Sequence, residues 1–181
     1  LADNYKVPRI GFVNKMDRPC REPLDLLDEL EKVLGIRSCP MSWPIGSGDR
    51  FRGIFDRSNK EVLLFQTEGE ANVKGRLAPL QTSGVDDPKL TEYLKRGEVD
   101  DGLDLYEQFK SELELLEYAG DAFDMERILA GQLSPVFFGS AMNNFGVEHF
   151  LKTFIKIAPC PTPRKIETSA GDEQQLIDPK S

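Results

Sequence analysis

Two stretches of this sequence share one pattern, and that pattern constrains the fold more than any other feature. Residues 8–13 (PRIGFV) and 135–141 (PVFFGSA) are short apolar runs of the kind that forms buried strands. Each run leads into a loop of small and polar residues and then into an amphipathic segment, residues 21–35 and 146–159. A strand followed by a loop and a helix is the front half of a βαβ unit, so the sequence predicts an α/β fold with a parallel sheet.

The first of these helices has clear start and stop signals. Pro23 suits a first helical turn, and Gly35 can end the helix in a left-handed conformation. Its apolar face is formed by leucines at helical spacing, namely Leu24, Leu27, Leu30 and Leu34.

The middle of the chain changes character. Residues 51–56 and 62–66 are expected to pair as a hairpin across residues 57–60, and the polar residues 68–97, rich in Gly and Pro, are expected to form a loop. Residues 100–120 predict a second strong helix, and residues 124–130 a shorter helix that ends at Gly131. The apolar stripe of the second helix is Leu105, Phe109, Leu113 and Leu116, and its expected stop is Gly120.

Composition narrows the function classes. The net charge of −8 argues against the chain as a whole being a nucleic-acid-binding surface. No apolar run approaches the roughly 18 residues that span a membrane, and the first residues lack the apolar core of a signal peptide. The three scattered cysteines, Cys20, Cys39 and Cys160, lack metal-site spacing and predict free thiols in a reducing compartment, so a cytoplasmic location is expected.

The loop after the first strand reads Asn14-Lys15-Met16-Asp17, which suits recognition of guanine. Guanine presents two adjacent donors, N1–H and the 2-amine, and the single carboxylate of Asp17 can accept both. Asn14 can bond the N7 edge of the base or brace neighbouring loops, and the apolar stem of Lys15 can lie on the face of the base. Met16 occupies the position that this motif leaves unconstrained. The competing interpretation is an ordinary polar turn between a strand and a helix.

The loop after the second strand completes the hypothesis. Gly139, Ser140, Ala141 and Met142 again follow a buried run and precede a helix. A small residue lets the backbone approach the base, so the amide of Ala141 can donate to guanine O6, and Ser140 can orient the carboxylate of Asp17. A tight packing turn is the alternative. Taken together, the predicted guanine-binding residues are Asn14, Lys15, Asp17, Ser140, Ala141 and Met142.

Nothing in the sequence predicts a phosphate or metal site. No G-x-x-x-x-G-K-[ST] pattern is present, and residues 44–53 (PIGSGDRFRG), the nearest candidate, are interpreted as a turn. No D-x-x-G precedes Asn14. Hydrolysis of GTP needs these parts, so no catalytic residue and no metal ligand is predicted. The single histidine, His149, is expected to be a helix-surface or interhelix residue.

Several longer stretches carry a resemblance to a known family. Residues 14–18 (NKMDR), 42–56 (SWPIGSGDRFRGIFD), 134–151 (SPVFFGSAMNNFGVEHFL) and 158–164 (APCPTPR) closely resemble bacterial peptide chain release factor 3, a family of translational GTPases similar to elongation factor G. The W-P-I-G-x-G stretch and the F-G-S-A-x-x-N-F-G-V stretch favour the release factor 3 family over elongation factor G. The resemblance covers about residues 1–165 and is weakest over residues 68–97.

The resemblance implies a partial P-loop GTPase-type parallel sheet, consisting of the last two strands with flanking helices, and an inserted α+β subdomain. The implied divisions are residues 1–38 and 132–159 for the GTPase domain, 39–131 for the insertion, and 160–181 for a linker to a β-barrel domain. The two loops would then end adjacent strands. The phosphate loop, the switches and the catalytic histidine of the family would lie upstream of Leu1, so the chain is expected to be an inactive fragment of a GTPase.

The family also implies a cofactor and partners. It binds GTP and GDP, with Mg²⁺ in the intact protein, hydrolyses GTP on the ribosome and recycles class I release factors. A fragment of an elongation factor G-type translocase stays open as an alternative. So does a module that binds a ribosomal stalk protein, because residues 98–117 hold eight acidic residues against Lys110. A solvated helix face is the favoured explanation of this charge pattern. The strand at residues 9–13 is expected to expose an edge through which two copies can associate.

Overall fold

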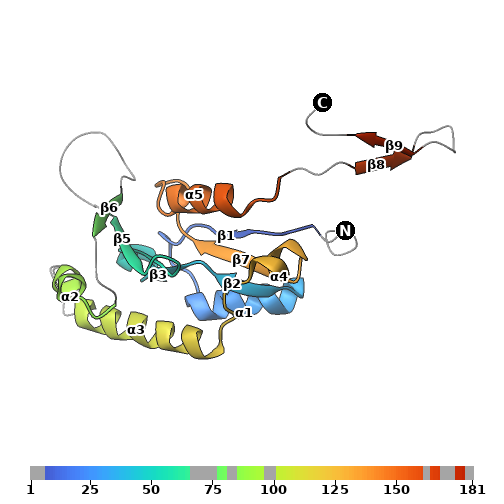
Figure 1. Ribbon diagram of the computed structural model, residues 1–181. Coiled ribbons are helices and arrows are strands. Elements are labelled where there is room, and N and C mark those ends of the chain that lie inside the picture. The colour runs from blue at the N-terminus through green and yellow to red at the C-terminus, as the bar shows by residue number, and fades with distance from the viewer. Residues whose placement is uncertain are drawn as a thin grey trace.

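The chain builds a parallel sheet with helices on both faces and an antiparallel sheet beside it (Figure 1). The computed structural model describes residues 7–65, 77–80, 85–95, 101–160, 164–167 and 174–177. The helices are α1 (Pro23–Leu34), α2 (Pro88–Lys95), α3 (Asp101–Ala119), α4 (Met125–Leu129) and α5 (Val147–Ile157), with a short 3-10 turn at Gly48–Arg50. The strands are β1 (Gly11–Val13), β2 (Arg37–Pro40), β3 (Ser42–Ile45), β4 (Gly53–Asp56), β5 (Glu61–Phe65), β6 (Leu77–Leu80), β7 (Leu133–Phe138), β8 (Arg164–Glu167) and β9 (Gln174–Ile177).

The parallel sheet confirms the predicted α/β class, and its strand order is β1–β7–β2. Phe12 of β1 is in register with Phe137 of β7, and Arg37 of β2 with Leu133. The sheet therefore has three strands, whereas the sequence predicted two. The strand β2 was missed because it is four residues long and ends in Pro40, so its sequence carries neither an apolar run nor a clear alternation.

The central strand β7 organises the core, because all six of its residues are buried. Side chains alternate across a strand, so Val136 and Phe138 join one hydrophobic cluster while Leu133 and Phe137 join another. The leucines of α1 pack against the first cluster, and Phe150 of α5 packs against the second. Figure 1 accordingly shows α1 and α5 on opposite sides of the sheet.

The predicted hairpin is confirmed as β4 and β5, which pair antiparallel within the four-stranded sheet β3–β4–β5–β6. The helix α3 is confirmed as well, and its predicted apolar stripe is buried. The loop predicted over residues 68–97 is wrong where the structure describes this region, because β6 and α2 lie there. The helix α2 is short, and Asp87 accepts a hydrogen bond from the Lys89 amide at its start while Leu90 and Leu94 are buried.

The residues of the predicted insertion (39–131) do not form a separate core. Trp43, Ile54 and Phe109 belong to the same hydrophobic cluster as Val136 and Phe138 of the parallel sheet. The division of the chain at residues 38/39 and 131/132 stays a prediction. The region predicted to be a linker, 160–181, contains β8 and β9, which pair antiparallel.

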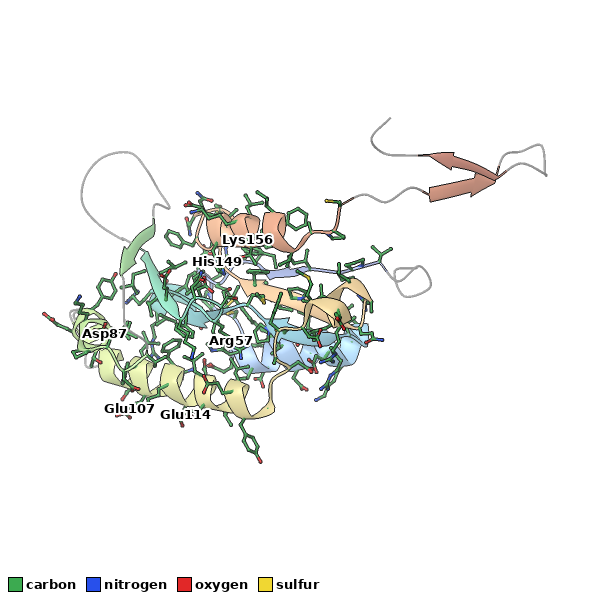
Figure 2. The ribbon with its side chains drawn as sticks, viewed as in Figure 1. Arg57, Asp87, Glu107, Glu114, His149 and Lys156 are labelled. Atoms are coloured by element: carbon green, nitrogen blue, oxygen red, sulfur yellow. The ribbon has the colours of Figure 1, made fainter. Side chains whose placement is uncertain are left out.

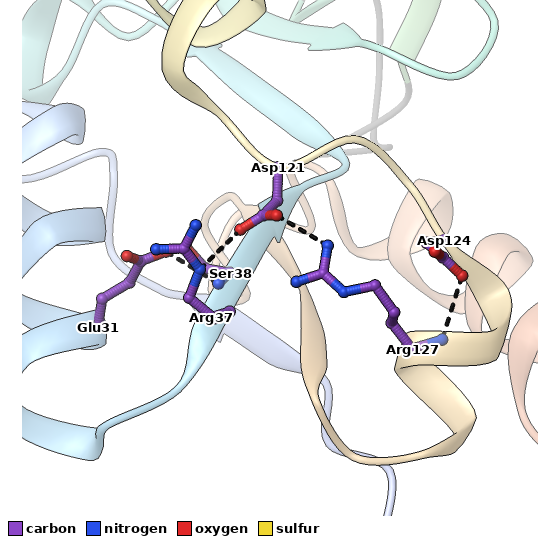
Figure 3. Close-up of polar contacts among 6 residues, drawn as sticks. All are labelled: Glu31, Arg37, Ser38, Asp121, Asp124 and Arg127. Carbon is purple, nitrogen blue, oxygen red and sulfur yellow. Dashed lines mark hydrogen bonds and ion pairs between the residues drawn. The ribbon is translucent and has the colours of Figure 1, made fainter.

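A group of ion pairs connects the segment that follows α3 to the parallel sheet and to α4 (Figure 3). Asp121 accepts from Arg37 of β2 at 2.9 Å and from Arg127 of α4 at 2.8 Å. The hydrogen bond from Arg127, with the charge of Arg37, lowers the pKa of the Asp121 carboxyl. Beside this group, Glu31 of α1 accepts from both the amide and the hydroxyl of Ser38, at 2.9 and 2.6 Å. These contacts join α1, β2 and α4 at the same end of the molecule.

The signals predicted for α1 are confirmed, because Pro23 opens the helix and Gly35 ends it with a φ of 62°. Leu34 departs from the predicted apolar face and is 59% exposed. The position predicted for His149 needs correction. Its side chain is only 9% exposed, and Nδ1 lies 3.3 Å from the Oδ2 atom of Asp56 on β4. The helical pattern did not reveal this, because the contacts of His149 include Asp56 of β4, which is distant in sequence, and Phe137 of β7.

Candidate functional site

Two loops meet at one edge of the parallel sheet. The loop of residues 14–17 follows β1 and the loop of residues 139–142 follows β7, and these strands are adjacent and parallel. The backbones are joined directly, since the Gly139 amide donates to the Val13 carbonyl at 3.0 Å and the Met16 amide donates to the Gly139 carbonyl at 3.1 Å. Ligands of α/β proteins bind at the carboxyl ends of parallel strands, which is where both loops lie.

Asn14 links the two loops through its side chain. Its Oδ1 atom accepts a hydrogen bond from the Ala141 amide at 2.9 Å and another from the Lys15 amide at 2.8 Å. Lys15 has a φ of 69°, which few residues other than glycine adopt. Of the two roles predicted for Asn14, the structure contains the brace between neighbouring loops. The amide of Ala141, predicted to meet guanine O6, is the group that Asn14 holds in place.

Asp17 is half-buried and is held by a residue that the sequence analysis did not single out. Its Oδ2 atom accepts from Asn143 Nδ2 at 3.0 Å. The contact expected between Ser140 and Asp17 is not formed among the described residues, where the Ser140 hydroxyl is buried and has no hydrogen-bond partner. Asn143 lies just past Met142, and an amide in a loop already suspected of binding was the signal that could have found it.

The two methionines of these loops behave in opposite ways. Met142, predicted to line the base, is 74% exposed. Met16, predicted to be unconstrained, is 1% exposed and belongs to the main hydrophobic cluster. The guanine motif describes contacts with the base, so it leaves this position open, whereas the structure constrains Met16 by burial. Met16 shares this cluster with residues distant in the sequence, such as Trp43 and Phe138.

The arrangement offers an acceptor and a donor on one edge. Asp17 supplies a carboxylate. Ala141 supplies a backbone amide, whose single N–H donates to Asn14 Oδ1 in the structure and becomes available to a base once it leaves that acceptor. Guanine has the complementary groups, with two donors for a carboxylate and a carbonyl oxygen for an amide, whereas adenine presents an amine where guanine has O6. The buried Ser140 hydroxyl is a further polar group at this edge. The residues present therefore fit a guanine base.

The described residues form neither a cluster of metal ligands nor a helix suited to a membrane. Within the described part of the chain, no group of three or more His, Cys, Asp or Glu side chains is placed to hold a metal ion. Among the described helices, none has the length and apolar character needed to span a membrane.

The described acidic residues of α3 divide into two kinds. Glu107 and Glu114 are exposed and lie on the outer side of the helix (Figure 2). Glu112 is buried, and its Oε2 atom accepts from Trp43 Nε1 at 2.7 Å.

Comparison with known proteins agrees with this geometry. The family model described as the elongation factor Tu GTP binding domain matches residues 1–160. Peptide chain release factor 3 of Symbiobacterium thermophilum is 45% identical over 174 residues, which cover 96% of this chain and 30% of that protein. Peptide chain release factor 3 of Synechococcus elongatus is 50% identical over 167 residues, which cover 92% of this chain and 28% of that protein. The chain thus spans about 30% of the length of these curated relatives.

A solved structure shows the fold independently. A crystal structure of a protein from Thermus thermophilus matches with a TM-score of 0.55 at 18% identity, covering 88% of this chain and 23% of that one. At this identity the match concerns the fold alone. It supports the parallel sheet and its flanking helices as a known arrangement.

Proposed function

We propose that this chain, which belongs to the family of elongation factor Tu GTP binding domains, forms the guanine-recognising part of a longer GTPase. The similarity to peptide chain release factor 3 makes translation termination the expected process. The observation that carries the proposal is the joining of the Asn14–Asp17 loop to the Ser140–Asn143 loop at the carboxyl ends of two adjacent parallel strands, through Asn14 with Ala141 and Asp17 with Asn143.

In the proposed complex, the Asp17 carboxylate accepts the N1–H and 2-amino donors of guanine. The Ala141 amide, whose N–H donates to Asn14 Oδ1 in the structure, exchanges that acceptor for O6. Asn143 holds the Asp17 carboxylate, and Asn14 keeps the second loop in place until the base arrives. The stem of Lys15 lies along the base, and Ser140 and Met142 border it. The base contacts select guanine, and they leave the phosphates to be bound by other residues.

The decisive experiment replaces Asp17 by Asn in the full-length protein that carries this chain. An amide keeps an acceptor for N1–H but places a donor against the 2-amine, so affinity for GDP should fall about tenfold to a hundredfold. Xanthosine diphosphate has a carbonyl oxygen in place of that amine, and its affinity should rise. Both dissociation constants are measured by calorimetry.

Asp25→Asn is the matched control, because it removes the same charge from an exposed position on the adjacent helix α1. It should leave both affinities unchanged. If Asp17→Asn bound GDP as tightly as the parent, or failed to gain affinity for xanthosine diphosphate, this loop would not read the base.

For the whole protein, we propose GTP hydrolysis on the ribosome coupled to the recycling of class I release factors, with Mg²⁺ and the phosphates held outside this chain. The chain alone is then expected to be inactive and to bind GTP very weakly, because it supplies only contacts with the base. Isothermal calorimetry of the 181-residue chain tests this expectation. Micromolar binding of GTP would contradict it.

A second candidate function, binding of a ribosomal stalk protein, has a specific observation in its favour. The exposed acidic residues of α3 include Asp104, Glu107, Glu114 and Glu117, which suit a basic partner. Charge reversal at Glu107 and Glu114 in the full-length protein should weaken capture of a stalk protein in a pull-down. Glu112 is unsuitable for this test because it is buried against Trp43. Unchanged capture would leave a solvated helix face as the explanation.

A further inference from the structure

The third residue of the guanine loop, Met16, is more deeply buried than the residues on either side of it. Asn14 and Lys15 are exposed and Asp17 is half-buried, whereas the Met16 side chain is 1% exposed. It lies in the cluster that contains Trp43, Ile45 and Phe51. The residue between the two base-reading positions therefore points away from the base and into the core.

The backbone of Met16 is held on both sides. Its amide donates to the Gly139 carbonyl at 3.1 Å, which joins it to the second loop. Its carbonyl accepts from the Gly48 amide at 2.8 Å, which joins it to the turn between β3 and β4. One residue thus connects both base-reading loops to the predicted insertion (39–131).

The turn that supplies Gly48 has little freedom to shift. Gly46 and Gly48 have φ values of 78° and 60°, and a Cβ atom added to Gly46 would lie 2.2 Å from the Arg50 carbonyl oxygen. The Phe51 amide donates to the Gly48 carbonyl at 3.1 Å, and the Arg52 amide donates to the Ile45 carbonyl at 2.9 Å. The glycines are required by this backbone path rather than by contact with a phosphate.

Two side chains of α3, Gln108 and Glu112, are hydrogen-bonded to the elements on either side of this turn and loop. Glu112 accepts from Trp43 Nε1 at 2.7 Å and from Gln108 Nε2 at 2.9 Å. Gln108 also donates to Glu22 at 2.8 Å, and Glu22 precedes α1, the helix that follows the guanine loop. The helix α3 therefore contacts β3 on one side of the loop and the start of α1 on the other.

We propose that Met16 and Gly48 are positioning residues for guanine recognition, through which the predicted insertion sets the affinity for the base. The inference rests on the proposed function, because it concerns the same site. Met16 acts through Asp17, which follows it directly, and through Gly139, which precedes Ser140 and Ala141. A partner or mutation that displaces the β3–β4 turn changes the spacing of the two base contacts.

The first test compares Met16→Ala with Ile128→Ala in the full-length protein. Both side chains are almost fully buried, but Ile128 belongs to the other cluster, near the amino-terminal end of β7. Met16→Ala should weaken GDP binding by about tenfold, an ordinary size for coupling between sites, while Ile128→Ala stays within about twofold. Met16→Leu, which conserves volume, should restore the parent affinity.

The second readout separates positioning from loss of folded protein. IDP lacks the 2-amino group that Asp17 is proposed to read, so the ratio of IDP to GDP dissociation constants reports the placement of Asp17. This ratio should fall in Met16→Ala and stay constant in Ile128→Ala. Both variants are measured well below their melting temperatures, so that each is fully folded.

A matched pair of glycine substitutions tests the link at Gly48. Gly48→Ala and Gly35→Ala place the same side chain at φ values of 60° and 62°, but only Gly48 donates to the loop. Gly48→Ala should weaken GDP binding and lower the selectivity ratio, and Gly35→Ala should change neither.

Two outcomes overturn the inference. One is an equal effect of Met16→Ala and Ile128→Ala on affinity, and the other is an unchanged selectivity ratio in Met16→Ala and Gly48→Ala. If Asp17→Asn switches the base preference while the Met16 and Gly48 variants bind as the parent does, only the positioning role fails. If Asp17→Asn has no effect, the proposed site itself fails.

Discussion

The chain contains two strand–loop–helix units that look alike in sequence and are stabilised in different places. In the first unit, β1 to α1, the strand is half-buried and the loop residue Met16 lies in the core. In the second, β7 to α5, the strand is completely buried and the loop residue Met142 is 74% exposed. The same pattern of apolar run, small loop and amphipathic helix therefore fixes an order of elements without fixing which element carries the packing.

The helices of the two units pack against different clusters, and each leaves apolar residues exposed, which in α1 are Val33 and Leu34. The leucines Leu24, Leu27 and Leu30 of α1 pack against the main cluster. The helix α5 leaves Leu151, Phe154 and Ile155 exposed, by 49%, 42% and 77%. What joins α5 to the rest of the molecule is chiefly Phe150 and the buried His149.

The largest expected effect tests the claim that the second unit depends on its strand. Phe138→Ala removes a fully buried ring that lies 5.1 Å from the ring of Trp43, and it should lower the free energy of unfolding by about 3–5 kcal/mol. Phe154→Ala, on the exposed side of α5, should cost only about 0.5 kcal/mol. Urea unfolding of both variants measures the difference, and similar losses would contradict the contrast between strand and helix.

An intermediate effect is expected where the first unit joins β2. Glu31→Ala removes the acceptor of both the amide and the hydroxyl of the buried Ser38. Unpaired buried polar groups are costly, so stability should fall by about 1–3 kcal/mol. Glu29→Ala is the matched control on the same helix, because Glu29 is exposed and contacts only the exposed Arg21 among the contacts described for it. Equal losses in the two variants would show that helix propensity, rather than the contact with Ser38, sets the cost.

Much of this fold could be predicted from the sequence, and the parts that could not share a physical cause. The helices α1, α3 and α5 follow from periodic leucines and aromatics, because helical periodicity is local information. The burial of β2 and of His149 depends on β7 and on Asp56, which are distant in the sequence. Periodicity reports that a face is apolar and does not report which element covers it.

The candidate site shows the same limit. The motif identified Asn14 and Asp17, because the chemistry of guanine dictates those residue types. It gave no information on Met16, whose side chain is buried in the cluster that also contains Trp43 and Ile45. It also missed Asn143, whose contact with Asp17 depends on the pairing of two strands.

The smallest expected effect concerns the one buried histidine that attaches α5 to β4. Burial lowers the pKa of His149, against the opposing charge of Asp56 and with added repulsion from Lys152 and Lys156 (Figure 2). The folded protein therefore binds this proton less readily than the unfolded chain, whose histidine titrates near 6.5. Stability contributed by neutral His149 is present above that value and is lost as the pH falls through the lower folded pKa.

The comparison that isolates this effect is His149→Phe against the parent, with urea unfolding at several pH values from 7.5 downward. Phenylalanine does not titrate, so the stability of the parent relative to the variant should decrease as the pH falls below about 6.5. Burial raises the pKa of Glu112, so this carboxyl makes the folded state more stable as the pH falls. The effect is the same in the parent and in the variant, and it cancels when their stabilities are subtracted. A constant difference would mean that His149 titrates equally in the folded and unfolded chains. The attachment of α5 through His149 would then be independent of pH, and the ring contact of His149 with Phe137 would persist in acid together with the contacts of Phe150 with Phe12 and Phe137.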